Sequence, residues 1–284
     1  GSTTSLVFAS GSNCNVTGTT TGAYPIPLAT WSATSSLTLS GSSTSTTTAA
    51  NNVQSFGNFI VNLTSLTGTL SFWTTSTTAL IQGDLTISST NTGIFRALTS
   101  GTLTINGNLN INSGKFQPTS STGTLITLGN TVIGSSGTLD LSAASASGSF
   151  SQRGSNFTNN GTISGGGTLS FFSPTNQALF LAGSGSITAN FSTLSIQSTG
   201  GLTISHSNQV PTLRVNLFQG TITGSNKITI GTGLALACLT QIGAAGLTSP
   251  GGNFDVAPTF NLGTGTYGLI YAQESVSRTT GFEI

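Results

Sequence analysis

The sequence carries very little charge. Aspartate, glutamate, lysine and arginine make up 4% of its 284 residues, and six basic and five acidic side chains leave a net charge of +1. An ordinary soluble domain has roughly 25% charged residues. With so few lysines and arginines, the chain cannot present a basic surface to nucleic acid or to an anionic membrane. We therefore expect neither of these partners.

Long hydrophobic runs are missing as well, and no segment repeats its apolar residues at a helical period. No apolar stretch approaches the roughly 18 residues of a transmembrane helix, so we expect no membrane insertion. The abundant residues are serine (43), threonine (52), glycine (38) and phenylalanine (16). Threonine, phenylalanine, isoleucine and valine favour strands. The composition therefore predicts an all-β protein.

A short unit recurs along the chain: glycine, then threonine or serine, then alternating apolar and polar residues. Each copy follows the previous one after 22 to 26 residues. Residues 81–87 recur at 105–111, residues 101–103 at 123–125, and residues 202–204 at 228–230; residues 137–141 recur twice, at 161–164 and at 185–188. Alternate side chains of a strand face opposite sides, so the apolar set can line an interior. We predict a right-handed parallel β-helix with roughly 22–26 residues per coil. A hairpin sandwich also fits short strands, but the nearly constant repeat length favours the solenoid.

The repeats divide the chain into two parts of one solenoid. Residues 1–50 are predicted to be a less regular N-terminal coil or loops, because prolines interrupt residues 24–27 and residues 43–48 are low in complexity. Residues 51–284 hold the β-helical repeats. The chain has no initial methionine or signal peptide, and residues 279–284 stop inside a predicted strand. We therefore expect an excerpt of a longer chain.

Residues 27–87 contain three distinctive stretches: Trp-Ser-Ala-Thr-Ser-Ser-Leu-Thr-Leu-Ser-Gly at 31–41, Gln-Ser-Phe-Gly-Asn-Phe at 54–59 and Gly-Asp-Leu-Thr-Ile at 83–87. With further matches at 154–162, 191–196 and 280–284, they resemble a module of very long secreted surface proteins of Bacteroidota. Such proteins usually end in a sorting domain of the type IX secretion system, which this sequence lacks. They are expected to form β-helical rods at the cell surface. The resemblance thus implies an extracellular location and transfers no catalytic residue.

Two kinds of residue are candidates for contacts outside a simple core. The aromatic residues Trp31, Trp73, Tyr267 and Tyr271 could form a platform for glycans, although packing in the core or at its rim is the favoured interpretation. The cysteines at 14 and 238 are far apart in sequence. We interpret Cys238, in an apolar run, as a small buried hydrophobe. Whether the two cysteines are free or bridged stays open.

Residues suited to catalysis or metal binding are scarce. Glycoside hydrolysis needs two carboxylates within about 5–10 Å, and a structural zinc site needs four ligands. The chain has one histidine, His206, and five scattered acids: Asp84, Asp140, Asp255, Glu274 and Glu283. We therefore predict no catalytic residue, no metal site, no cofactor and no enzymatic activity.

Ice binding by a solenoid would require the pattern Thr-x-Thr at the same position of every coil. Such pairs occur at 102/104 and at 221/223. Asn108 with Asn110 and Thr168 with Ser170 interrupt the series. The sequence therefore places ice binding low among the alternatives.

Together these features predict a structural segment of a secreted cell-surface rod, filament or adhesive appendage. Its action would be mechanical, and its partners would be copies of itself or other segments of a parent chain. The main alternative is an adhesin or carbohydrate-binding module that contacts cell-surface glycans. A β-helix enzyme that degrades polysaccharides is a weaker alternative, like ice binding.

Overall fold

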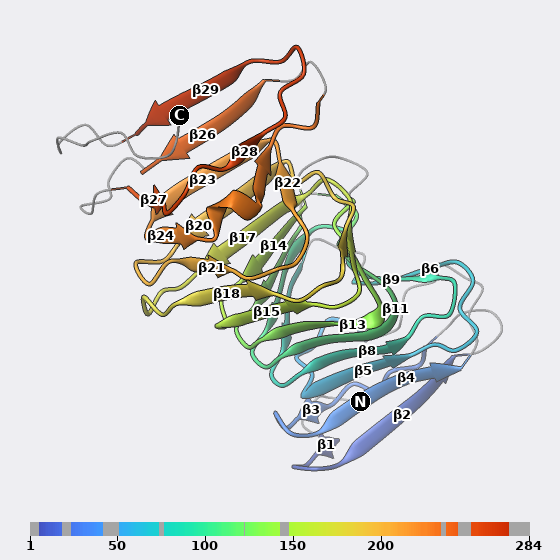
Figure 1. The fold of residues 1–284 in the computed structure, drawn as a ribbon. Helices are drawn as coiled ribbons and strands as arrows, with labels where there is room; N and C mark the ends of the chain where they lie inside the picture. The colour runs from blue at the N-terminus through green and yellow to red at the C-terminus, as the bar shows by residue number, and fades with distance from the viewer. Residues whose placement is uncertain are drawn as a thin grey trace.

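Stacked parallel coils form the whole described part of the chain (Figure 1). A computed structural model describes residues 6–18, 24–41, 51–73, 77–121, 123–142, 148–233, 237–243 and 251–272. The fold is an all-β parallel solenoid of about nine turns with about 24 residues per turn, and these residues contain no α-helix. The prediction of an all-β parallel solenoid is confirmed. The low-complexity segment 43–48 and the chain end 279–284 lie outside the described residues.

One side of the stack is a nine-stranded sheet. Each coil contributes one strand to it, and neighbours in space are about a coil apart in sequence. In spatial order the strands are β7 (Thr77–Ile81), β10 (Gly101–Ile105), β12 (Thr124–Thr127), β14 (Ser149–Gln152), β17 (Thr168–Phe172), β20 (Thr193–Gln197), β23 (Arg214–Gln219), β26 (Cys238–Ile242) and β29 (Tyr267–Tyr271).

A fifteen-stranded sheet forms most of the remaining surface. Its main path is β2 (Asn13–Gly18), β4 (Ser36–Gly41), β5 (Asn58–Asn62), β8 (Leu85–Ser89), β11 (Leu109–Thr119), β13 (Thr131–Asp140), β15 (Asn156–Asn159), β18 (Leu179–Ala182), β21 (Leu202–Ile204), β24 (Thr221–Thr223) and β27 (Asn253–Phe254). A branch contains β6 (Thr69–Trp73), β9 (Ile94–Leu98), β16 (Thr162–Ser164) and β19 (Ser186–Ile187). β4 pairs with β5, so described residues on both sides of position 50 belong to the same stack.

Two small sheets and one short helix complete the description. The small sheets are β1 (Val7–Phe8) with β3 (Thr30–Trp31), and β22 (Val210–Thr212) with β25 (Ile228–Ile230) and β28 (Thr259–Phe260). The 3-10 helix η1 spans Ser225–Lys227.

The long strands β11 and β13 turn a corner and join the main path to the branch. Leu109 and Ile111 of β11 pair with β8, whereas Lys115 and Phe116 of the same strand pair with β9. Between the two halves Gly114 has a φ of 84°. This left-handed conformation strains any residue with a Cβ atom. The glycine thus allows one continuous strand to serve two sides of the coil.

The strand register agrees with most of the predicted repeats. Leu109 and Ile111 lie beside Leu85 and Ile87, and residues 102–103 lie beside 124–125. One predicted match is wrong: Leu202 pairs with Ile222, only 20 residues later. Residues 228–230 pair instead with β22 in another sheet. The helix η1 intervenes before residue 228, so the sequence period does not match the spatial stack there.

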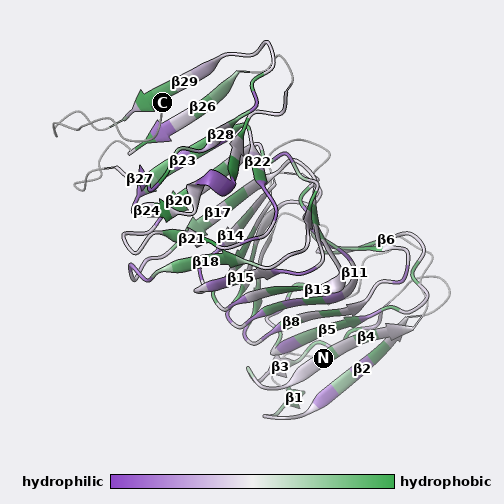
Figure 2. Ribbon diagram, viewed as in Figure 1, coloured by the Kyte–Doolittle hydropathy of each residue, from purple (hydrophilic) through white to green (hydrophobic). Residues whose placement is uncertain are grey.

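Alternating side chains produce one continuous core along the stack. Figure 2 shows hydrophobic and hydrophilic residues following one another along the central strands. One interior column contains, in register, Leu37, Phe59, Leu85, Leu109, Thr131, Phe157, Leu181 and Ile204. All of these side chains are buried, and Thr131 donates a 2.6 Å hydrogen bond to Oε1 of buried Gln152. The N-terminal coils add an aromatic cluster in which Phe59 lies 4.8 Å from Phe72, between ring centres.

Candidate interaction surfaces

A ladder of side-chain oxygens joins successive coils at the corner before the main-path strands. Oδ1 of Asn58 accepts the backbone N–H of Asp84 at 2.9 Å, and Oδ1 of Asp84 accepts that of Asn108 at 2.7 Å. Oδ1 of Asn108 then accepts the N–H of Asn130 at 2.9 Å, and Asn130 accepts that of Asn156 at 3.1 Å. We call these five residues the corner ladder. Because each rung uses a side chain of one coil and the backbone of the next, the ladder fixes the register of the stack.

Glycines make room for the corner ladder. A Cβ atom on Gly107 would lie 2.2 Å from Oδ1 of Asp84, and one on Gly83 would lie 2.1 Å from Oδ1 of Asn58. Contacts shorter than 3.0 Å require one of the atoms to move, and backbone atoms also lie this close: the carbonyl carbon of Gly83 at 2.6 Å from a Cβ on Gly107, and the carbonyl oxygen of Ala33 at 2.8 Å from one on Gly83. The recurring pair of glycine followed by asparagine or aspartate is therefore a packing motif between coils.

The two tryptophans that were candidates for a glycan platform lie inside the solenoid. Trp31 is 3% exposed, its ring lies 4.1 Å from that of Phe8, and its Nε1 donates to Oε1 of Gln54 at 3.1 Å. Trp73 is fully buried, and its Nε1 donates to the carbonyl of Asn52 at 2.8 Å. Neither ring offers a face on which a sugar could stack in this structure.

The two tyrosines that were candidates for the same platform lie in β29, at the far end of the stack from the tryptophans (Figure 1). Tyr267 packs edge-on against Phe260 with ring centres 4.9 Å apart, whereas Tyr271 is 37% exposed. The four aromatic residues are therefore not brought together into one platform.

The single histidine and the cysteines are separate from one another. His206 is buried; its Nδ1 lies 3.1 Å from the backbone N of Asn208, and its Nε2 lies 3.3 Å from Nδ2 of Asn159. No disulfide bond joins Cys14 in β2 to Cys238 in β26. Burial raises the pKa of both thiols, which disfavours the reactive thiolate.

The described acids have distinct local partners. Asp84 belongs to the corner ladder, and Asp255 accepts hydrogen bonds from the backbone N–H groups of Gly224 and Ser225 at the start of η1, at 2.8 and 3.0 Å. Glu274 and Glu283 lie outside the described residues. Among the residues that the structure describes, no group of three histidine, cysteine, aspartate or glutamate side chains could hold a metal ion.

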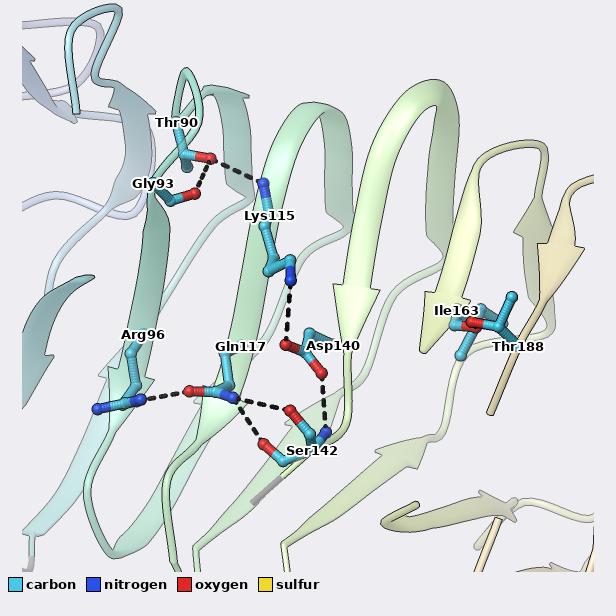
Figure 3. A network of polar contacts seen from close by, with 9 residues as sticks. All are labelled: Thr90, Gly93, Arg96, Lys115, Gln117, Asp140, Ser142, Ile163 and Thr188. Atoms are coloured by element: carbon cyan, nitrogen blue, oxygen red, sulfur yellow. Dashed lines mark hydrogen bonds and ion pairs between the residues drawn. The ribbon is translucent and has the colours of Figure 1, made fainter. Parts of the chain in front are cut away.

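Three charged side chains, Arg96, Lys115 and Asp140, lie in a polar cluster on the branch side of the fifteen-stranded sheet (Figure 3). Asp140 is 5% exposed and forms an ion pair with Lys115, with 3.7 Å between Nζ and Oδ2. Its other carboxylate oxygen accepts the backbone N–H of Ser142 at 3.0 Å. The carboxylate of Asp140 is thus occupied by neighbouring groups of the chain.

Arg96 and Gln117 extend the polar cluster across four coils, from Ser71 to Ser142. Nε of Arg96 donates to Oε1 of Gln117 at 2.6 Å, and Nε2 of Gln117 donates to the carbonyl of Ser142, also at 2.6 Å. Nη1 of Arg96 is 3.4 Å from the hydroxyl of Ser71. Burial lowers the pKa of Arg96, while the charge of Asp140 acts in the opposite direction. The cluster holds coils together through partners within the chain.

The outer side of the nine-stranded sheet carries two columns of short side chains. Strand register aligns one residue of each column in six successive strands, from β7 to β20. The first column is Thr78, Thr102, Thr124, Ser149, Thr168 and Thr193, and the second is Leu80, Thr104, Ile126, Ser151, Ser170 and Ser195. We call these twelve positions the hydroxyl face. Ten of them carry a hydroxyl group and none is charged.

The register shows which of the pairs compared on the sequence share a surface. Thr168 and Ser170 occupy the same two columns as Thr102 and Thr104, so Ser170 does interrupt a strict Thr-x-Thr series, which β10 alone keeps. A hydroxyl group stands in both columns in β10, β14, β17 and β20. The asparagines at 108 and 110 lie before and in β11, and residues 221 and 223 form β24, all on the fifteen-stranded sheet. The sequence could not show this because every coil repeats the same alternation on more than one side.

No protein-family model, curated protein or solved structure matches the chain. No helix among the described residues is long and apolar enough to span a membrane. The class of protein that the strand register defines is the parallel β-solenoid.

Proposed function

We propose that this chain is a structural rod segment of an exported cell-surface protein, filament or appendage, and that it acts mechanically. The observation that carries the proposal is the corner ladder, in which each rung joins the side chain of one coil to the backbone of the next. Parallel backbone pairing runs beside it along the same stack. A solenoid whose coils are joined by both kinds of bond resists bending and extension.

The surface composition supports an extracellular role. Hydroxyl and amide side chains occupy many outward strand positions where soluble proteins commonly carry lysine and glutamate. The resemblance of residues 27–87 to modules of Bacteroidota surface proteins favours the cell surface and export of a parent chain by the type IX system. The proposal includes no enzymatic activity and no cofactor.

We infer that the partners are copies of this chain or other segments of the parent chain. Low charge supports this inference, because it leaves little electrostatic repulsion between rods that lie side by side. In sedimentation at micromolar concentration, the purified chain should form elongated oligomers. A compact monomer at every concentration would contradict self-association.

The rod role itself is tested by imaging the native assembly. Antibodies against the chain should label filaments or stalks at the cell surface, and the labelled segments should be elongated. Exclusive labelling of intracellular material would overturn the proposal. Glycan-array binding by the isolated chain, with no labelled appendage, would favour the adhesin alternative instead.

A further inference from the structure

The hydroxyl face differs from the other polar surfaces of the rod in the way its side chains are used. In the corner ladder and the polar cluster, side chains bond to neighbouring coils. On the hydroxyl face only Ser149 and Thr124 bond to each other, at 2.9 Å, while Thr168 lies 3.5 Å from Ser192. The other hydroxyl groups form no side-chain hydrogen bond within the described part of the chain; they belong to Thr78, Thr102, Thr104, Ser151, Ser170, Thr193 and Ser195.

The twelve positions of the hydroxyl face lie at regular intervals in two directions, but Leu80 and Ile126 interrupt the hydroxyl groups of the second column and Ser151 is only 9% exposed. Hydrogen-bonded strands lie about 4.7–4.9 Å apart, which sets the spacing along each column. Two residues of a strand span about 6.6–6.8 Å, which sets the spacing between the columns. Because five of the six strands are paired on both sides, β7 being the edge strand, and because buried residues such as Leu103 and Leu125 anchor them, the array is ordered before any ligand arrives.

We propose that the hydroxyl face binds the surface of ice. The water oxygens of an ice surface form a neutral two-dimensional lattice whose repeats are close to the two spacings above. An uncharged array with unused hydroxyl groups can hold water in matching positions, and the threonine methyl groups together with Leu80 and Ile126 limit competing hydration. This function is additional to the rod role and does not depend on it.

A soluble sugar or a charged ligand fits the same face less well. The two columns contain no aromatic ring on which a sugar could stack and no charge that could select an ion. Their regular feature is periodicity over six strands, and only a periodic ligand can use it. Crystalline polysaccharide is the other periodic ligand, and the experiment separates it from ice.

The test compares the intact chain with two lysine variants. Thr104→Lys places a long charged side chain in the middle of the hydroxyl face. Thr162→Lys is the matched control, because Thr162 is a half-buried strand residue on the branch of the other sheet. Its column already contains Lys115, so lysine is compatible with that surface.

Ice-affinity partitioning, inhibition of ice recrystallisation and thermal hysteresis are measured on all three proteins, with circular dichroism to verify folding. The intact chain and Thr162→Lys should enter ice and inhibit recrystallisation, and folded Thr104→Lys should lose both activities. If the folded intact chain neither enters ice nor inhibits recrystallisation, the proposal is overturned. Binding to microcrystalline cellulose or chitin that Thr104→Lys abolishes, without ice activity, would assign the face to polysaccharide and also overturn it.

Should Thr104→Lys fail to fold, Thr193→Lys at the other column replaces it with the same expected losses. Full ice activity in a folded variant of either column would show that ice binds elsewhere and would contradict the assignment to this face.

Discussion

At the corner before each main-path strand, a single glycine and a single amide or carboxylate control the distance between coils. Gly107 has no room for a Cβ atom because Oδ1 of Asp84 and the backbone of Gly83 occupy that space. Asn108 directly follows this glycine and carries the next rung of the ladder. Two adjacent residues thus combine a steric requirement with a hydrogen bond, and each can be tested by substitution.

Gly107→Ala should lower the free energy of unfolding by about 2–3 kcal/mol, as strained substitutions do. The new Cβ would lie 2.6 Å from the carbonyl carbon of Gly83. Gly166→Ala is the control, since its nearest atom would be the carbonyl oxygen of Asn190 at 3.4 Å. Urea unfolding measures both variants, and equal losses would contradict the steric role of Gly107.

Asn108→Ala should cost about 1 kcal/mol, because the N–H of Asn130 loses its acceptor. Asn110 lies in the same region of the chain, is half-buried and makes no side-chain hydrogen bond within the described residues. Asn110→Ala should therefore change stability by no more than about 0.5 kcal/mol. Thermal or urea unfolding of the two variants measures the contribution of the corner ladder to stability. A larger loss of stability in Asn110→Ala than in Asn108→Ala would contradict that contribution.

At the scale of single elements, η1 shows how one carboxylate can secure a short helix. Burial would raise the pKa of Asp255, but hydrogen bonds from the Ser225 hydroxyl and from the backbone of Gly224, Ser225 and Val256 outweigh burial and lower it. The folded state therefore favours the ionised carboxylate. The resulting stabilisation is complete above the pKa of the unfolded chain and is lost as the pH falls through the lower folded pKa.

This linkage predicts a pH-dependent difference between the intact chain and Asp255→Asn. The variant should be less stable at neutral pH, and the difference should shrink as the pH falls below about 4, the ordinary pKa of aspartate. Urea unfolding at several pH values measures it. A difference that stays constant through the acidic range would show that ionisation of Asp255 does not stabilise the fold.

The sequence predicted which residues of a strand are buried better than it predicted which strands pair. The alternation of residues 103–111 correctly placed Leu103, Ile105, Leu109 and Ile111 inside. The pairing of Leu202 was wrong because a coil of 20 residues and η1 change the period locally. The two columns of the hydroxyl face were missed, because alternation gives the side of a strand but not the sheet to which it belongs.

On the scale of the whole molecule, the stack is quasi-one-dimensional, since each coil contacts mainly its neighbours. The aromatic cluster around Phe59, with Phe56, Phe72, Trp73 and Phe95, is confined to the N-terminal coils. A substitution in this cluster should therefore destabilise the adjacent coils more than distant ones.

Phe59→Ala should destabilise these coils by about 3–5 kcal/mol through loss of buried surface and creation of a cavity. Hydrogen exchange should accelerate in β5, β6 and β8 while β20 and β23 keep their protection. Phe180→Ala is the control, because Phe180 is 39% exposed. Uniform loss of protection along the rod in the Phe59 variant would contradict the one-dimensional description.

The sequence by itself determined that the protein is all-β, nearly uncharged and built from coils of about 24 residues, because composition and a two-residue alternation act locally. Only the tertiary structure decided which residues share a column, since the number of residues between strands varies from coil to coil. The tertiary structure places Trp31 and Trp73 in the core, brings Arg96 into a hydrogen bond with Gln117, and aligns hydroxyl groups from six strands on one face.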